Sequence, residues 1–158
     1  MGFTLTSTAF KDAGPIPVMY TCDGADLSPP LAWSGVPQGT VALALIADDP
    51  DAPARTWVHW VLYDVPAAFG ALPENVSKVE APKELKGAVQ GRNDSHDLGY
   101  GGPCPPPGPA HRYFFKVYAL AAPLGLKAGA SKQDVERAMA GHVLATAQLM
   151  GTYARQRR

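Results

Sequence analysis

The sequence lacks the features that mark nucleic-acid-binding and membrane-spanning proteins. Its 14 basic residues balance 14 acidic residues, so no excess of positive charge predicts a nucleic-acid partner. No segment approaches the roughly 20 consecutive apolar residues that cross a bilayer, so we expect no integral membrane contact. The first residues have neither the basic start nor the apolar run of a secretory signal. These absences predict a cytoplasmic protein.

Cysteine is also scarce, because the chain contains only Cys22 and Cys104. The two do not form a CxxC pair, and in a reducing compartment both are expected to be free thiols. The sequence has no Gly-x-Ser-x-Gly nucleophile elbow, no P-loop and no dinucleotide-binding fingerprint. We therefore expect no bound metal and no cofactor.

Glycine and proline, in contrast, are abundant, with 16 of each among 158 residues. This content exceeds ordinary usage but lies below the level typical of disorder, and 46% of the residues are hydrophobic. The combination favours a loop-rich β protein. The length predicts a single domain over residues 1–158, with enough chain to bury a core.

Periodicity predicts strands and one helix. Strand patterns occur at residues 3–8, 41–47, 57–65, 88–90 and 113–120. The run 41–47 is apolar throughout, which is typical of a strand buried on both faces. Only the C-terminal region has a helical period. Ser131 and Asp134 resemble a capping box, and the apolar spacing that follows predicts a helix from about 132 to 150.

The segment 99–110, which we call the collar loop, is built of glycine and proline and runs directly into the aromatic strand. Prolines fix φ, while glycines let the backbone turn tightly and approach a ligand closely. The collar loop leads to His111, an ionisable group at the first step of the strand. This arrangement predicts a rigid loop at the rim of a site.

Ionisable side chains occur at the end or on one face of three predicted strands. Asp49 and Asp51 follow the apolar run, and His111 and Tyr113 share one face of the aromatic strand. His59 lies within the strand 57–65, where the period of two predicts a common face with residues 57, 61 and 63. If the three strands are neighbours, these groups converge on one pocket.

Such a pocket would suit an anion. Two imidazoles, the Tyr113 hydroxyl and the backbone amides of Gly101 and Gly102 would form a compact receptor for an oxyanion. A hydrogen bond from a histidine to Asp49 would fix the tautomer of that ring and favour its protonated form. The hypothesis predicts phosphate binding that weakens above neutral pH.

Simpler structural interpretations are also open. His59 could be a core histidine bonded to Asp49, and Arg112 could form a structural ion pair. Tyr113 and Tyr118 could belong to the core, and the aspartates at 48, 49 and 51 could be turn formers.

Two further chemistries remain as weaker alternatives. Two histidines and a carboxylate match a facial-triad metal site, although the spacing lacks the local pairing common in such sites. Cys104 near His111 could be an activated thiol, but no attacking base accompanies it in the sequence.

Three motifs in register resemble the phosphatidylethanolamine-binding protein family. They are residues 48–53 (Asp-Asp-Pro-Asp-Ala-Pro), residues 57–60 (Trp-Val-His-Trp), and residues 99–103 (Gly-Tyr-Gly-Gly-Pro) leading to 111–113 (His-Arg-Tyr). Residues 22–24, 27–31 and 33–37 are similar to the bacterial Raf-kinase-inhibitor-like branch, the YbhB/YbcL group. The resemblance implies a mainly β fold, a β-sandwich with a large central sheet, a smaller second sheet and peripheral helices that include a C-terminal helix.

The resemblance also implies a pocket for phosphate, a phosphoryl head group or a carboxylate. By motif, the ligand-binding residues would be Asp49, Asp51, His59, Gly102, Pro103, Cys104, His111 and Tyr113. No catalytic residue is assigned, although an acid/base enzyme that uses His59 and His111 is the alternative. The family's naming suggests a protein kinase or protease as a further partner. Because the chain ends soon after the expected helix, we expect a homodimer in which a second subunit covers the pocket.

Overall fold

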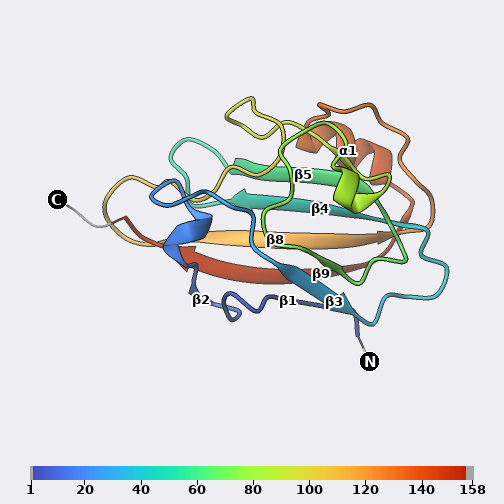
Figure 1. Ribbon diagram of the computed structural model, residues 1–158, viewed down its shortest axis with the longest axis horizontal. Coiled ribbons are helices and arrows are strands. Elements are labelled where there is room, and N and C mark those ends of the chain that lie inside the picture. The colour runs from blue at the N-terminus through green and yellow to red at the C-terminus, as the bar shows by residue number, and fades with distance from the viewer. Residues whose placement is uncertain (1, 156–158) are drawn as a thin grey trace.

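Two β-sheets dominate the computed structural model, which describes residues 2–155 (Figure 1). The larger sheet contains, in spatial order, β2 (Gly14–Pro15), β9 (Val143–Tyr153), β8 (His111–Leu120), β4 (Ala42–Asp49), β5 (Trp57–Pro66) and β7 (Val89–Gln90). The smaller sheet contains β1 (Thr4–Thr6), β3 (Leu31–Ser34) and β6 (Ala71–Leu72). All pairings are antiparallel except that of β2 with β9. The predicted mainly β fold with two sheets is confirmed.

The large sheet is covered on both faces. Its inner face packs against the small sheet in a cluster that includes Leu5 and Trp33 on one side and Trp60 and Phe115 on the other. The opposite face packs against α1 (Lys132–Met139) in a second cluster. Every residue of β4 is buried as a result, which confirms the prediction for residues 42–47 of the apolar run, whereas Val41 precedes the strand and is exposed. Two short 3₁₀ helices, η1 (Val18–Tyr20) and η2 (Lys83–Leu85), lie in the connections.

The predicted helix over 132–150 is wrong after Met139. Its capping box forms as expected between Ser131 and Asp134, but the helix has only eight residues. Gly141 then adopts a φ of +83°, a left-handed conformation that ends the helix, and the chain continues as β9. The segment 143–153 also has a period of two, and pairing with the whole length of β8 satisfies its backbone. No helix among residues 2–155 is long and apolar enough to cross a membrane.

A β-bulge at His59 changes the face that was predicted for this residue. Ala47 pairs with Trp60 and Asp48 pairs with Val58, so β5 has one more residue than β4 at this point. The extra residue shifts the alternation of side chains. Residues 61 and 63 therefore pack in the cluster beneath α1, whereas His59 lies on the opposite side, beside Tyr113.

Candidate functional site

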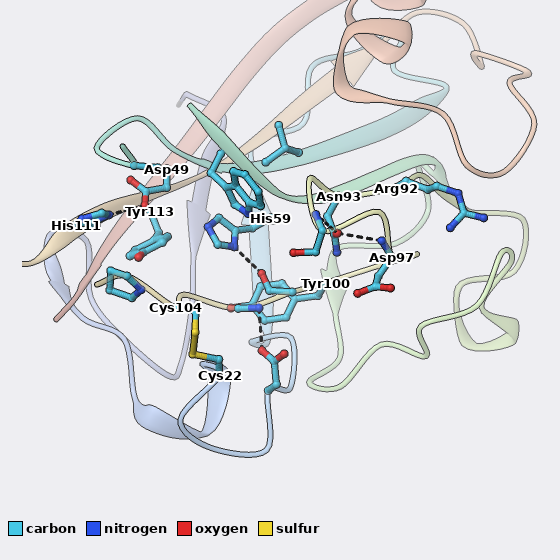
Figure 2. A pocket seen from close by; sticks show the side chains of 18 of the residues that line it. Cys22, Asp49, His59, Arg92, Asn93, Asp97, Tyr100, Cys104, His111 and Tyr113 are labelled. Carbon is cyan, nitrogen blue, oxygen red and sulfur yellow. Dashed lines mark hydrogen bonds and ion pairs between the residues drawn. A yellow bond between two sulfur atoms is a disulfide. The ribbon is translucent and has the colours of Figure 1, made fainter. Parts of the chain in front are cut away.

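A cavity of about 790 Å³ lies where the end of β4 meets the starts of β5 and β8 (Figure 2). Antiparallel pairing brings these three strand ends together, because Asp49 pairs with Trp57 and Asp48 with Phe114. The collar loop and the segment 22–26 close the cavity from the other side. Of the residues predicted for the site, six line this pocket: Asp49, His59, Gly102, Cys104, His111 and Tyr113. Asp51 and Pro103 are not among its lining residues.

Asp49 orients a histidine, but the histidine is His111 rather than His59. The His111 Nδ1 lies 2.7 Å from the Asp49 Oδ2. The other carboxylate oxygen, Oδ1, accepts the backbone N–H of Asp51 at 2.7 Å. Only 4% of the Asp49 side chain and 12% of the His111 side chain are exposed. The carboxylate therefore holds a proton on Nδ1 of His111 and leaves the other ring nitrogen, Nε2, for further contacts.

His59 is oriented by the backbone of the collar loop. Its Nδ1 lies 2.6 Å from the carbonyl oxygen of Gly101, and a carbonyl oxygen can only accept a hydrogen bond. Nδ1 therefore carries the proton. Burial lowers the pKa of His59, although the Gly101 carbonyl and the charge of Asp49 act in the opposite direction. Burial therefore favours the neutral ring, in which Nε2 presents a lone pair.

Tyr113 lies between the two imidazoles. Its ring contacts His59 edge-on at 5.2 Å between centroids and stacks on His111 at 6.4 Å. Burial, followed by the charge of Asp49, raises the pKa of Tyr113, so its hydroxyl stays protonated. That hydroxyl is buried and makes no hydrogen bond of good geometry within residues 2–155, although the Asp49 carboxylate lies close enough to contribute to its raised pKa. A buried hydroxyl without a partner costs about 1–3 kcal/mol, so it is a position at which a ligand atom would be stabilising.

Asp51 points to Arg112 instead of to the cavity. The Arg112 guanidinium donates to both Asp51 oxygens at 2.9 Å, and the Arg112 backbone N–H also donates at 2.9 Å. The side-chain hydrogen bond from Arg112 lowers the pKa of Asp51 to about 2. The structural interpretation of Arg112 is therefore confirmed. The pair fixes the loop after β4 to the first residues of β8, which carry His111.

The collar-loop amides do not form the predicted oxyanion receptor. The Gly101 N–H donates to the carbonyl oxygen of His59 at 2.9 Å, and the Gly102 N–H donates to the Asp26 Oδ1 at 2.8 Å. Both donors are already used within the protein. Gly102 is needed for a different reason, since a Cβ atom there would collide with the Tyr20 carbonyl oxygen.

The expectation of two free thiols is wrong, because Cys22 and Cys104 form a disulfide. Their Cα atoms are 5.4 Å apart although 82 residues separate them in the chain. The Cys22 N–H also donates to the Pro103 carbonyl oxygen at 3.1 Å. The bridge fastens the collar loop to the segment 22–26 at the rim of the pocket (Figure 2). It excludes Cys104 as an activated thiol and removes one argument for a reducing compartment.

Sequence reasoning missed the far side of the pocket. Figure 2 shows Arg92, Asn93 and Asp97 on the other side of His59 from His111. Asp26 and Lys78 also line the cavity, and the Lys78 Nζ donates to the Asp26 carbonyl oxygen at 3.0 Å. These residues lie in irregular segments without a motif, so no pattern in the sequence predicts them. No group of three His, Cys, Asp or Glu side chains in the described part of the chain could hold a metal ion, so the facial-triad alternative has no support.

Comparison with known proteins gives one consistent result. Residues 6–154 match the family model described as phosphatidylethanolamine-binding protein. A UPF0098 protein of Methanothermobacter thermautotrophicus is 55% identical over 151 residues, which cover 96% of this chain and 98% of the relative. The crystal structure of Escherichia coli YbcL, described as a new member of the mammalian PEBP family, has a TM-score of 0.92 at 35% identity and covers 99% of this chain and 100% of its own. The structure of a putative PEBP homologue, CT736 of Chlamydia trachomatis, has a TM-score of 0.89 at 40% identity, with coverage of 98% and 99%.

Proposed function

The chain belongs to the phosphatidylethanolamine-binding protein family, and from this premise we propose that its pocket binds a small oxyanion. The candidate ligands are inorganic phosphate, a phosphoryl head group and a carboxylate. The name of the family, which refers to a phosphate-containing head group, and the chemistry of the pocket both support this class of ligand. Binding would use His59, His111 and Tyr113, with Asp49 as the residue that orients His111.

The observation that carries the proposal is the Tyr113 hydroxyl. It is buried, Tyr113 lines the cavity, and within the described residues the hydroxyl makes no hydrogen bond of good geometry, its nearest charged neighbour being Asp49. An oxygen of the ligand would accept its proton and remove the cost of the unpaired donor. No other fully buried side-chain nitrogen or oxygen in residues 2–155 lacks a hydrogen bond, so this feature is specific to the pocket.

Charge at the same place supports an anion rather than a neutral ligand. A protonated His111 ring donates from both nitrogens, one to Asp49 and one to the ligand. Lys78 and Arg92 line the far side of the cavity together with Asp26 and Asp97. The Lys78 Nζ lies 3.8 Å from the Asp26 carboxylate, so His111 is the group that favours an anion. Phosphate binding that weakens above neutral pH stays a prediction, and calorimetry repeated at higher pH tests it.

Calorimetric titration with inorganic phosphate at pH 6 tests the proposal. Tyr113→Phe removes only the hydroxyl and should weaken binding about tenfold. Tyr118→Phe is the matched control, because this tyrosine lies on the same strand but packs against the cluster beneath α1. Tyr118→Phe should bind as the unchanged protein does. Absence of phosphate binding, or equal affinities for the two variants, would contradict the proposal.

An acid/base enzyme is the second candidate, and the orientation of the two histidines favours it. His59 presents a lone pair that can accept a proton, while His111 is held by a carboxylate that stabilises its charged form. A panel of phosphomonoesters distinguishes the two candidates. Turnover that disappears in both His59→Gln and His111→Gln would support the enzyme, whereas binding without turnover supports the simple receptor.

Three further properties stay predictions. A homodimer, in which a second subunit covers the pocket, is tested by the mass from light scattering. Inhibition of a protein kinase or protease is tested by capture of such a partner with the unchanged protein and with His111→Gln. A cytoplasmic location is tested by cell fractionation, and the disulfide between Cys22 and Cys104 weighs against it.

A further inference from the structure

We propose that His59 makes the pocket select oxyanions that carry a proton, such as hydrogen phosphate, over oxyanions that carry none, such as sulfate. The inference rests on the proposed function and specifies its ligand class. Phosphomonoester monoanions belong to the favoured class, because they retain one P–O–H group. Phosphodiesters belong with sulfate, because they have no acidic proton left to donate. The intact phospholipid after which the family is named is a phosphodiester, so the inference favours a detached phosphomonoester over that lipid.

The geometry at Gly101 determines which kind of partner His59 accepts. Its Nδ1 must donate to the carbonyl oxygen at 2.6 Å, so a neutral ring has a bare lone pair at Nε2. Figure 2 shows this second nitrogen directed away from the collar loop, on the side where Tyr113 lies. Nε2 makes no hydrogen bond to any residue among 2–155 and, unlike the Tyr113 hydroxyl, is not fully buried, because the ring lines the cavity. A ligand at this position must therefore donate to His59.

The groups around His59 do not remove this constraint. Asp49 faces it from β4, Asp26 from the segment 22–26, and Tyr113 from β8, while the charge of Asp48 acts from the opposite face of the sheet. The three carboxylates favour a protonated ring, but burial outweighs them and lowers the pKa of His59. Lys78 and Arg92 lie on the far side of the same cavity. His59 therefore stays an acceptor at neutral pH.

Hydrogen phosphate and sulfate then differ in a single respect. Both are tetrahedral and both carry two negative charges in mildly alkaline solution, but only hydrogen phosphate has an O–H to donate to Nε2. Sulfate would place an oxygen lone pair against the nitrogen lone pair, or it would force the buried ring to take up a proton. Either alternative has a free-energy cost that hydrogen phosphate avoids.

Calorimetry at pH 7.5 with sodium phosphate and sodium sulfate, each measured in two buffers of different ionisation heat, tests the inference. We expect sulfate to bind about tenfold to a hundredfold more weakly, and any sulfate binding to take up about one proton. His59→Gln should bring the two affinities close together, because its amide can rotate to donate or accept. His142→Gln, an exposed substitution just before β9, should preserve the selectivity.

The possible outcomes distinguish a failure of the selectivity from a failure of anion binding itself. Phosphate and sulfate binding with affinities within threefold of each other would overturn the selectivity and leave anion binding intact. Selectivity that persists in His59→Gln would also overturn it, since another group would then be responsible. If His59→Gln does not fold, the inference is still tested by the unchanged protein, through the ratio of its phosphate and sulfate affinities and the protons taken up with sulfate. No phosphate binding at any pH would overturn the proposed function itself.

Discussion

Asp48 and Asp49 are neighbours at the end of β4, but their side chains lie on opposite faces of the large sheet. Asp48 faces α1, where the Lys132 Nζ lies 2.8 Å and the Lys116 Nζ 4.0 Å from its oxygens. Asp49 faces the cavity, where its partner is His111. Both carboxylates are buried to the same extent, with 3% of each residue exposed. Burial alone therefore does not distinguish a structural carboxylate from a functional one.

The chemistry of the partner makes the distinction. A surface lysine is charged at neutral pH, so Lys132 balances the negative charge of Asp48. The pair directs no further group toward a ligand. A histidine compensates Asp49 and still has a second nitrogen directed elsewhere. The cavity face and the α1 face of the large sheet also differ in their unpaired polar groups. Among residues 2–155, the buried hydroxyl without a partner, that of Tyr113, lines the cavity, whereas the face beneath α1 has none.

The largest expected effect comes from removing the covalent link on the pocket side. Replacing both Cys22 and Cys104 by serine opens a connection that spans 82 residues, and the free energy of unfolding should fall by about 2–5 kcal/mol. Denaturation by urea measures the loss, and reduction of the unchanged protein by dithiothreitol is the matched control. An unchanged midpoint in both experiments would show that the hydrogen bonds of the collar loop suffice.

Asp48→Asn should come next, because it leaves Lys132 beside a neutral group in a buried position. We expect a loss of about 2–4 kcal/mol in the free energy of unfolding. Phosphate affinity should change less than twofold, because Asp48 faces away from the cavity. Urea denaturation and calorimetry measure the two quantities on the same sample. A large loss of affinity together with unchanged stability would reverse the distinction between the two aspartates.

Asp49→Asn should give the opposite pattern. The neutral form of His111 remains acceptable beside an amide, so the expected loss of stability is only about 1 kcal/mol. Phosphate affinity should fall about tenfold, because the charged form of His111 loses its stabilising carboxylate. The matched control is Asp48→Asn, measured in the same buffers. Equal affinity in the two variants would contradict the account of the pocket.

Asp49 also shows which features of the site the sequence predicts and which it does not. The strand patterns and the motif around residue 49 predict that β4, β5 and β8 bring Asp49, His59 and His111 to one pocket, and the structure does so. Which histidine Asp49 contacts depends on the bulge in β5, because the extra residue determines the direction of His59. A one-residue irregularity in pairing leaves no signal in a single sequence.

Long-range pairing explains the other differences. The segment 143–153 fits a helix or a strand when considered alone, and only its neighbour β8 decides between them. Cys22 and Cys104 are distant in the chain and meet because the collar loop packs on the segment 22–26. The far side of the pocket, with Arg92 and Asp97, is assembled from loops whose positions follow from tertiary packing.

The smallest expected effect concerns the exposed pair of Asp51 and Arg112. The pKa of Asp51 is lowered from 3.8 to about 2, so the stabilising contribution of this pair is present above pH 3.8 and is lost as the pH falls toward 2. Arg112→Ala should reduce the pH dependence of the free energy of unfolding within this range. Arg137→Ala is the control, because backbone hydrogen bonding at Ser131 is the main cause of the lowered pKa of Asp134. If the free energy of unfolding varies with pH equally in the two variants, Arg112 is not the cause of the lowered pKa of Asp51.

A crystal structure of the protein soaked in inorganic phosphate at pH 6 tests the central claim most directly. The account predicts one phosphate ion in the cavity, with its oxygens within hydrogen-bond distance of the Tyr113 hydroxyl and of Nε2 of both His59 and His111. The contact to His59 should belong to a protonated phosphate oxygen, while Asp49 keeps its bond to His111. An empty cavity at a phosphate concentration that gives a calorimetric signal, or an ion bound only at Lys78 and Arg92, would contradict it.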